Sequence, residues 1–217
     1  MIKKLTPAVC VLIFLFLTLC ACDAGNEEIQ PEAKIATDSS GNKYSVVVDV
    51  NGFLSLGDRD SLAVCTTDEN GNPGKNSDGE FVTRAEDFPD TLMVDNEIHT
   101  RFFRMPVPEG WTNISDEIVK LSSETAKLTI NDRGITPVKE CTEEIKNIMS
   151  AIGEGKEEKA ELQFADAVKL TYENRISVYI FEAEGRTYFI RVTADEKLFE
   201  EINFEEIINT IKFRKGE

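Results

Sequence analysis

The chain begins with an apolar run that has no charged residue from Leu5 to Cys22 and that directly follows two lysines. A basic start followed by an apolar stretch of this length is typical of an export signal. A stretch of 18 uncharged residues is also close to the roughly 20 residues that cross a bilayer as a helix. The run therefore predicts either a cleaved signal or an uncleaved anchor, and in both cases the rest of the chain faces outward.

The last four residues of this run favour one kind of signal. Leu19-Cys20-Ala21-Cys22 resembles the bacterial lipobox, in which a peptidase cuts before a cysteine that carries diacylglycerol. Ala21 supplies the small residue before the cut, whereas Cys20 as the acceptor would follow the bulky Leu19. We therefore expect residues 1–21 to be a lipoprotein signal peptide and Cys22 to be lipidated. Each buried acyl methylene contributes about 0.8 kcal/mol, so the acyl chains would hold the protein at the membrane.

Two stretches of different pattern follow. Residues 22–42 are polar and acidic without a sustained hydrophobic period, which predicts a flexible tether, with a short helix as the alternative. In residues 43–98, short runs of strand formers are separated by turn residues, and Asn51-Gly52 is a strong hairpin signal. We expect this second stretch to be a small β-rich segment with several Asp/Asn-Gly turns.

The remaining stretch, residues 99–215, alternates between strands and helices. Thr136 is expected to cap a helix whose apolar residues recur at steps of three and four, which predicts one buried face. Glu184-Gly185 predicts a hairpin turn, and Asn203 is expected to cap a second helix from about Phe204 to Phe213. The apolar face of the first helix comprises Val138, Cys141, Ile145, Ile148, Met149 and Ile152.

A soft family resemblance covers this last stretch. The order of paired strands, helix, antiparallel strands and terminal helix, with MPVPEGW at 105–111 and INTIKF at 208–213, resembles the PsbP-like α/β/α sandwich. That fold belongs to the extrinsic photosystem II protein and to many secreted or lipid-anchored bacterial relatives. The resemblance implies an α+β fold, an antiparallel sheet packed by two main helices, to which the N-terminal β-rich segment is an addition. It also implies a binding or assembly role, and it transfers no functional residue.

The charge balance excludes one class of partner. Without Lys3 and Lys4, 22 basic residues face 40 acidic ones, a formal net charge of −18. Such a surface is repelled by nucleic acid, whose binding relies on basic side chains that displace counterions. We therefore expect no nucleic-acid partner.

The sequence carries no recognisable catalytic or cofactor motif. His99 is the single histidine, and no GxSxG, HExxH or glycine-rich phosphate loop accompanies it, so we interpret it as a surface histidine and expect no cofactor. Residues 68–79 have the spacing of the first EF-hand ligands, but Pro73 and Gly79 stand where that loop needs Gly and Glu. We expect no metal site there.

Two cysteines remain beyond the lipidation site. Cys65 and Cys141 lie 76 residues apart and are not part of a CxxC motif. They could form a disulfide in an oxidising compartment, or they could be two small apolar residues in or near a core. The position of Cys141 on the apolar helical face favours the second interpretation.

Aromatic residues are the remaining candidates for a ligand-binding site. Trp111 follows Pro-x-Gly and offers an apolar ring with a polar handle, and Phe102 and Phe103 are adjacent in a strand, so they must face opposite sides. We regard these three as weak ligand-binding candidates, with core packing as the alternative.

These features together indicate a lipid-anchored protein on the extracytoplasmic face of a bacterial cell membrane. We expect a binding or assembly module that is not an enzyme, with an envelope protein or a small ligand as its partner. The alternatives are an envelope hydrolase that uses paired carboxylates and a surface spacer without a ligand.

Overall fold

The computed structural model describes residues 30–68, 70–115 and 119–215. Its contacts divide the chain into two units, Met1–Gln30 and Pro31–Glu217, and the second holds all the described helices and strands. The expected signal peptide and its lipidated cysteine, Cys22, lie outside the described residues, so both stay predictions.

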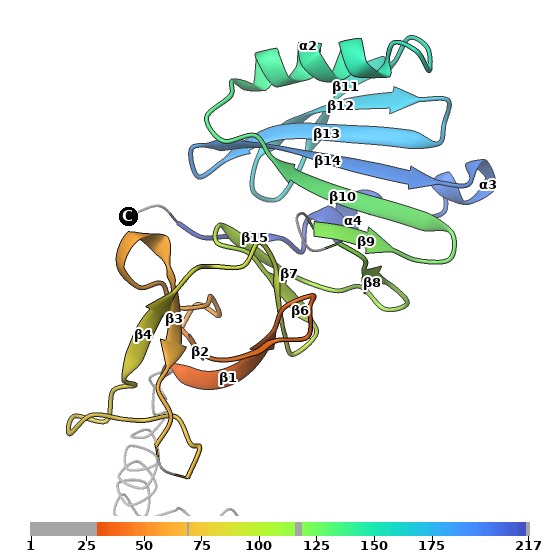
Figure 1. Cartoon of the computed structure of the whole chain (residues 1–217). Helices are drawn as coiled ribbons and strands as arrows, with labels where there is room; N and C mark the ends of the chain where they lie inside the picture. Colours follow the sequence, from red (N-terminus) through yellow and green to blue (C-terminus); the bar gives the residue numbers. More distant parts are fainter. Residues whose placement is uncertain (1–29, 69, 116–118, 216–217) are drawn as a thin grey trace, which may run out of the picture. The chain divides into compact units, whose positions relative to one another are not determined.

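One antiparallel sheet has eight strands in the spatial order β15-β7-β6-β5-β1-β2-β3-β4 (Figure 1). It contains strands from both sides of the expected boundary between residues 98 and 99. The C-terminal strand also belongs to it, since Phe213 pairs with Phe103. The strands are β1 (Glu32–Thr37), β2 (Lys43–Val48), β3 (Leu62–Cys65), β4 (Thr83–Glu86), β5 (Leu92–Val94), β6 (Glu97–His99), β7 (Phe103–Pro106) and β15 (Lys212–Phe213).

Strand β1 occupies residues 32–37 of the stretch for which the polar composition predicts a tether. It pairs with β2 over six residue pairs, and Thr37 also pairs with Met93 of β5. Of its residues, Ala36 alone is fully buried, whereas Ile35 is 58% exposed. Its extended conformation is therefore stabilised by backbone hydrogen bonds to neighbouring strands more than by burial of its own side chains.

A second antiparallel sheet has seven strands in the order β11-β12-β13-β14-β10-β9-β8. The hairpin predicted at Glu184-Gly185 is confirmed: it joins β13 to β14, and both turn residues have positive φ, as a two-residue type I′ turn requires. The strands are β8 (Thr112–Asn113), β9 (Val119–Ser122), β10 (Ala126–Asp132), β11 (Lys156–Glu161), β12 (Asp166–Tyr172), β13 (Ile176–Ala183) and β14 (Arg186–Ala194).

The predicted α+β class, with one sheet packed by two main helices, is wrong. The described residues are 45% strand and 13% helix, and they form two antiparallel sheets and three α-helices, α2 (Val138–Met149), α3 (Glu196–Phe199) and α4 (Phe204–Ile208). Asn203 does cap α4 through the amide of Glu206, as predicted. The helix nevertheless ends at Ile208, because the next residues extend to pair with β7 and bring Phe213 against other aromatic rings.

The buried face of α2 differs from the predicted face at two positions, of which Ile152 lies beyond the end of the helix and is 37% exposed. Cys141, Ile145 and Met149 are buried as expected, and so is Thr142, whose hydroxyl donates to the carbonyl of Val138. Ile148 is 64% exposed, so its assignment to the buried face is wrong. At about 100° per residue, the buried arc is centred between Ile145 and Met149, and Ile148 falls beyond its edge.

Apolar side chains of both sheets share one core. This core includes Ile98 and Met105 of the eight-stranded sheet and Leu128 and Ile190 of the seven-stranded sheet, all 0% exposed. A smaller core lies within the eight-stranded sheet, and another lies beneath α2. Five aromatic rings meet in the shared core with centroids 4.9–6.0 Å apart, namely Phe103, Phe164, Phe181, Tyr188 and Phe213.

Four connections in the first half of the folded unit repeat the same five-residue turn, 38–42, 49–53, 68–72 and 76–80. Each begins with Asp or Asn, whose side-chain oxygen accepts a backbone N–H within the turn, and each has a glycine with positive φ at its fourth position. The first amide donates to the carbonyl of the fifth residue in each. The turn predicted at Asn51-Gly52 is therefore confirmed, as one of four copies.

Candidate functional site

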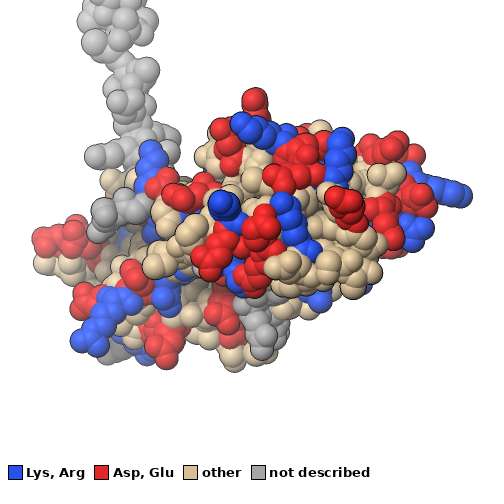
Figure 2. Space-filling model, turned by 90° about the horizontal axis from the view of Figure 1, so that it is seen from above, with Lys and Arg blue, Asp and Glu red and all other residues tan. Residues whose placement is uncertain are grey.

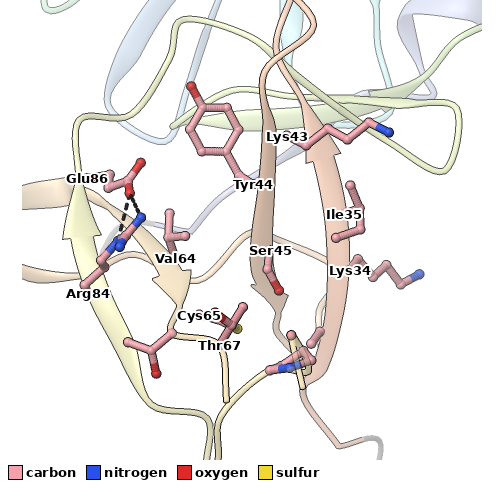
Figure 3. Close-up of a pocket in the computed structure, with 14 residues that line it drawn as sticks. Lys34, Ile35, Lys43, Tyr44, Ser45, Val64, Cys65, Thr67, Arg84 and Glu86 are labelled. Atoms are coloured by element: carbon pink, nitrogen blue, oxygen red, sulfur yellow. Dashed lines mark hydrogen bonds and ion pairs between the residues drawn. The ribbon is translucent and has the colours of Figure 1, made fainter. Parts of the chain in front are cut away.

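A pocket of about 640 Å³ lies between the β1–β2 hairpin and the β3–β4 hairpin (Figure 3). Within each hairpin the strands pair over four to six residues, but β2 and β3 pair only between Val46 and Val64 in the described part of the chain. Beyond this pair the hairpins separate, toward Lys43 on β2 and toward Thr67 after β3. The pocket therefore exists because one ladder of the sheet stops early.

Hydroxyl groups line the middle of the pocket. The Tyr44 hydroxyl donates to Asp38 at 2.9 Å, and the Thr66 hydroxyl donates to the carbonyl of Val82 at 3.1 Å. Ser45 and Thr67 line the same surface. A hydroxyl that donates its proton to the protein keeps lone pairs that can accept a hydrogen bond, so the pocket offers acceptors to a ligand with hydroxyl or amide donors.

Charged groups lie at the sides of the pocket. Arg84 pairs with Glu86 at 2.7 Å, and Lys34 pairs with Asp95 at 2.7 Å, a hydrogen bond that raises the pKa of Lys34. Lys43 is exposed and makes no ion pair with the described residues. Basic groups therefore outnumber acidic ones in the described lining, three to one.

The thiol in the pocket is a poor nucleophile. Cys65 is 4% exposed, and burial raises the pKa of its thiol, while the Ser45 hydroxyl lowers that pKa in part. Because the thiolate is the reactive form of cysteine, the group stays protonated and unreactive near neutral pH. The arrangement suits binding better than covalent chemistry.

The two phenylalanines singled out from the sequence come together at a second, smaller pocket of about 250 Å³ between β7 and β10. Phe103 is buried in the shared core, and Phe102 lies under the guanidinium of Arg186, 4.0 Å from its ring centroid. Trp111 is half-buried against the shared core and does not line this pocket. Most of the phenylalanine and tryptophan surface is thus used in packing.

His99 is 3% exposed, so its interpretation as a surface histidine is wrong. Desolvation lowers its pKa to about 4, although Glu97, with an oxygen 3.6 Å from the ring nitrogen, opposes this effect. The nearby charges of Arg104 and Arg214 lower the pKa further. The ring is therefore neutral at physiological pH and is enclosed in the eight-stranded sheet.

A cluster of cations and one aromatic ring lies beside His99. Arg104 donates to Glu97 at 2.8 and 3.0 Å and to the carbonyl of Asn51 at 3.1 Å. The guanidinium carbons of Arg104 and Arg214 lie 5.4 and 4.9 Å from the centroid of the Phe53 ring. These contacts hold the turn at 49–53 against β7 and β15, so the cluster has a structural role.

The segment with EF-hand-like spacing forms turns of the protein's own backbone. The Oδ1 atom of Asp68 accepts hydrogen bonds from the backbone amides of Asn70 and Asn72 at 2.9 and 2.8 Å, and these bonds lower the pKa of Asp68. Among the described residues, no group of three or more His, Cys, Asp or Glu side chains is arranged to hold a metal ion.

Cys65 and Cys141 are both free and buried, which confirms their interpretation as small apolar residues. Cys141 lies in the core beneath α2, whereas Cys65 ends β3. Since Cys141 lies on α2 and Cys65 on β3 and both thiols are free, the alternative of a disulfide is wrong for this structure.

Sequence reasoning did not find the pocket residues Lys34, Lys43 and Arg84. Each stands in a short polar or charged stretch that, by itself, is typical of a solvated surface. The fold and this site define an antiparallel β protein with a polar pocket between two hairpins.

A scan against protein-family models found no match, and a search of curated proteins found no similar sequence. In the part of the chain that the structure describes, no helix has the length and apolar character needed to cross a bilayer.

Proposed function

We propose that this chain is a binding module, not an enzyme, that is anchored through lipid on Cys22 to the extracytoplasmic face of a bacterial membrane. The anchor rests on the lipobox-like sequence that ends at Cys22. The observation that carries the binding role is the pocket between the β1–β2 and β3–β4 hairpins, whose volume of about 640 Å³ is within the range of small-molecule sites.

The position of the pocket along the chain fits this anchored role. Strand β1 contributes Ala33, Lys34 and Ile35 to the lining, and Pro31 follows Cys22 by nine positions. Nine extended residues span at most about 30 Å. The binding site would therefore operate close to the membrane surface, where an envelope ligand is presented.

The chemistry of the pocket favours binding over the hydrolase alternative. A glycosidase-type reaction needs two carboxyl groups around the scissile bond. Among the described lining residues Glu86 alone carries a carboxylate, and Arg84 already binds it. The protonated Cys65 thiol offers no nucleophile in its place.

The anchor is tested by intact-mass spectrometry and membrane fractionation of the native protein and of Cys22→Ala. The native protein should carry the mass of a diacylglycerol-modified cysteine and stay with the membrane. The variant should lack this mass. A native protein without lipid would contradict the anchor, whatever the variant does.

The binding role is tested by native mass spectrometry of the protein isolated from its own membranes. We expect a non-covalent adduct on the native protein and its loss in Thr67→Trp, in which the indole fills the pocket. Ile148→Trp, an exposed substitution on α2, is the matched control and should keep the adduct. An adduct that persists in Thr67→Trp, or the absence of an adduct on every form, would contradict a ligand in this pocket.

A further inference from the structure

Strand β4 forms an open edge of the eight-stranded sheet. It is last in the strand order, and no described strand lies beyond it (Figure 1). Thr83, Arg84 and Ala85 of this strand are exposed, and Val82, directly before the strand, is 42% exposed although it is apolar. An open edge presents backbone N–H and C=O groups that have no partner within the sheet, and another strand can bind them.

The hydrogen bonds between β3 and β4 show which residues face this edge. The amide of Thr66 donates to the carbonyl of Val82, so the backbone of Val82 points toward β3. Since the backbone groups of successive strand residues point to alternate sides, Arg84 also bonds to β3. Thr83 and Ala85 therefore direct their backbone groups to the open edge.

The side chains of this edge carry both signs of charge. Arg84 and Glu86 lie two positions apart on one face of β4, and Figure 3 shows the ion pair between them, which measures 2.7 Å. The side chain of Arg84 is 66% exposed in this pair, so the pair contributes at most about 1 kcal/mol. Both groups can therefore bind a further charge that approaches along the edge.

A second copy of β4 complements this edge in one antiparallel register. With Ala85 opposite Ala85 of the second copy, the two residues exchange both backbone hydrogen bonds. In the same register, Arg84 of each copy lies opposite Glu86 of the other, which gives two attractive cross-strand pairs.

The neighbouring registers are unfavourable. A shift by two residues is the smallest that keeps the edge-facing backbone groups paired, because the direction of these groups alternates. One such shift places Arg84 opposite Arg84 of the second copy, and the other places Glu86 opposite Glu86. Like charges directly opposite each other are destabilising, so the charges of β4 select a single register.

We infer that two copies of this chain associate through β4, around a two-fold axis at Ala85, and that their eight-stranded sheets join into one continuous sheet. The net acidic charge of the chain does not oppose this association strongly. On the face that Figure 2 shows, acidic and basic side chains lie side by side, so the charge is not gathered into one patch. Exposed charges farther apart than about 8 Å are also largely screened at physiological salt.

The small size of the contact connects this association to the anchor. A pair of four-residue strands buries less than the roughly 1,000 Å² expected of a stable complex. Free copies in dilute solution should therefore associate weakly. The lipid anchor proposed above confines the copies to one surface and raises their effective concentration, and in this respect the inference rests on the proposed function.

Disulfide cross-linking in native membranes tests the pairing and its register. In the expected register the two Ala85 Cα atoms are about 5.5 Å apart, a distance that a disulfide bridges. Ala85→Cys should therefore give a cross-linked dimer under mild oxidation. Thr83→Cys, on the same edge, is the matched control and should stay monomeric, because its two copies lie about 13 Å apart. The native Cys65 and Cys141 are buried.

Charge reversal tests how the two edges recognise each other. Arg84→Glu and Glu86→Arg each place like charges opposite one another, so each variant alone should associate at least tenfold more weakly than the native lipoprotein. Sedimentation equilibrium in detergent micelles measures this association. A mixture of the two variants regains both attractive pairs and should form a heterodimer as tightly as the native protein dimerises. Lys159→Glu on β11, an edge strand of the other sheet, is the control and should change nothing.

Several results would overturn the inference. Absence of a cross-linked dimer of Ala85→Cys in native membranes contradicts the pairing, and equal cross-linking of Thr83→Cys contradicts the register. A mixture of the two charge variants that stays monomeric contradicts the recognition of Arg84 by Glu86. The intact mass of the same samples reports the lipid on Cys22, so absence of the anchor and absence of the strand pairing are distinguishable.

Discussion

Arg214 donates a hydrogen bond of 2.5 Å to the backbone carbonyl of Leu54, which joins two residues 160 positions apart. The same guanidinium donates to the carbonyl of Arg101 at 3.1 Å and lies against the Phe53 ring. The end of the chain thus holds the first hairpins of the folded unit in place. Burial lowers the pKa of Arg214, which nevertheless stays charged at any physiological pH because arginine titrates so high.

Removal of this clamp should destabilise the whole folded unit. Arg214→Ala leaves the carbonyls of Leu54 and Arg101 without their donor, and we expect a loss of about 2 kcal/mol in the free energy of unfolding. Urea unfolding measures it. Arg191→Ala, at an exposed arginine of β14, is the control and should change the free energy by less than about 0.5 kcal/mol. Equal effects of the two substitutions would show that the hydrogen bonds of Arg214 do not stabilise the folded unit.

The close approach of Gly52 to Arg104 makes a second prediction. Gly52 and Gly71 occupy the same position of two copies of the five-residue turn, with φ of +80° and +82°. A Cβ on Gly52 would lie 2.8 Å from the guanidinium carbon of Arg104, whereas a Cβ on Gly71 would meet nothing within 4 Å. Both alanine variants carry the strain of a left-handed residue.

The difference between the two variants isolates the contact with Arg104. We expect Gly52→Ala to lower the free energy of unfolding by about 1 kcal/mol more than Gly71→Ala does, because the arginine must move from its place against Phe53. Equilibrium unfolding of both variants in urea measures this difference. Identical losses would mean that Arg104 moves without penalty and that the packing of the turn against β7 is loose.

The buried His99 predicts how stability depends on pH. Its pKa is lowered to about 4 in the folded protein, against roughly 6.5 in the unfolded chain. Between these values the unfolded state binds more protons, so His99 contributes stability that is fully present above about pH 6.5 and is lost as the pH falls toward 4.

Substitution separates His99 from the many carboxylates that titrate in the same range. From pH 7 to pH 4, the native protein should lose up to about 3 kcal/mol more stability than His99→Gln, in which nothing titrates at this position. Urea unfolding at a series of pH values gives both curves. Parallel curves would show that the ring is accessible to protons in the folded state.

Two isoleucines of α2, three positions apart, should differ in their contribution to the free energy of unfolding. Ile145 is 7% exposed and packs in the core beneath the helix, whereas Ile148 is 64% exposed. Ile145→Ala should therefore cost about 3 kcal/mol, and Ile148→Ala less than about 0.5 kcal/mol. Thermal unfolding of both variants distinguishes them. A large effect at Ile148 would mean that another surface covers the outer side of α2.

Some local structures of this protein could be predicted from its sequence, because they depend on interactions between nearby residues. The turns at Asn51-Gly52 and Glu184-Gly185 and the cap at Asn203 depend on residues a few positions apart, and all three are confirmed. The other copies of the five-residue turn were also accessible, because Asp or Asn at the first position and Gly at the fourth recur in each. The lipobox-like end of the apolar run is of the same local kind and stays a prediction.

The tertiary structure alone decided the rest, because strand pairing depends on partners far along the chain. Residues 32–37 form β1 because they pair with β2 and β5, although their own pattern predicts a tether. Residues 212–213 form β15 because they pair with β7, although their own pattern predicts a helix. His99 is buried by the sheet that forms around it. The pocket exists because β2 and β3 separate after one pair, and no property of Lys43 or Arg84 by itself encodes that separation. The cap predicted at Thr136 is wrong, because Pro137 is the N-cap of α2 and no side chain caps that helix. The sequence determined the turns and the cap at Asn203, where the interacting groups are neighbours, and the fold determined which side chains from distant strands meet.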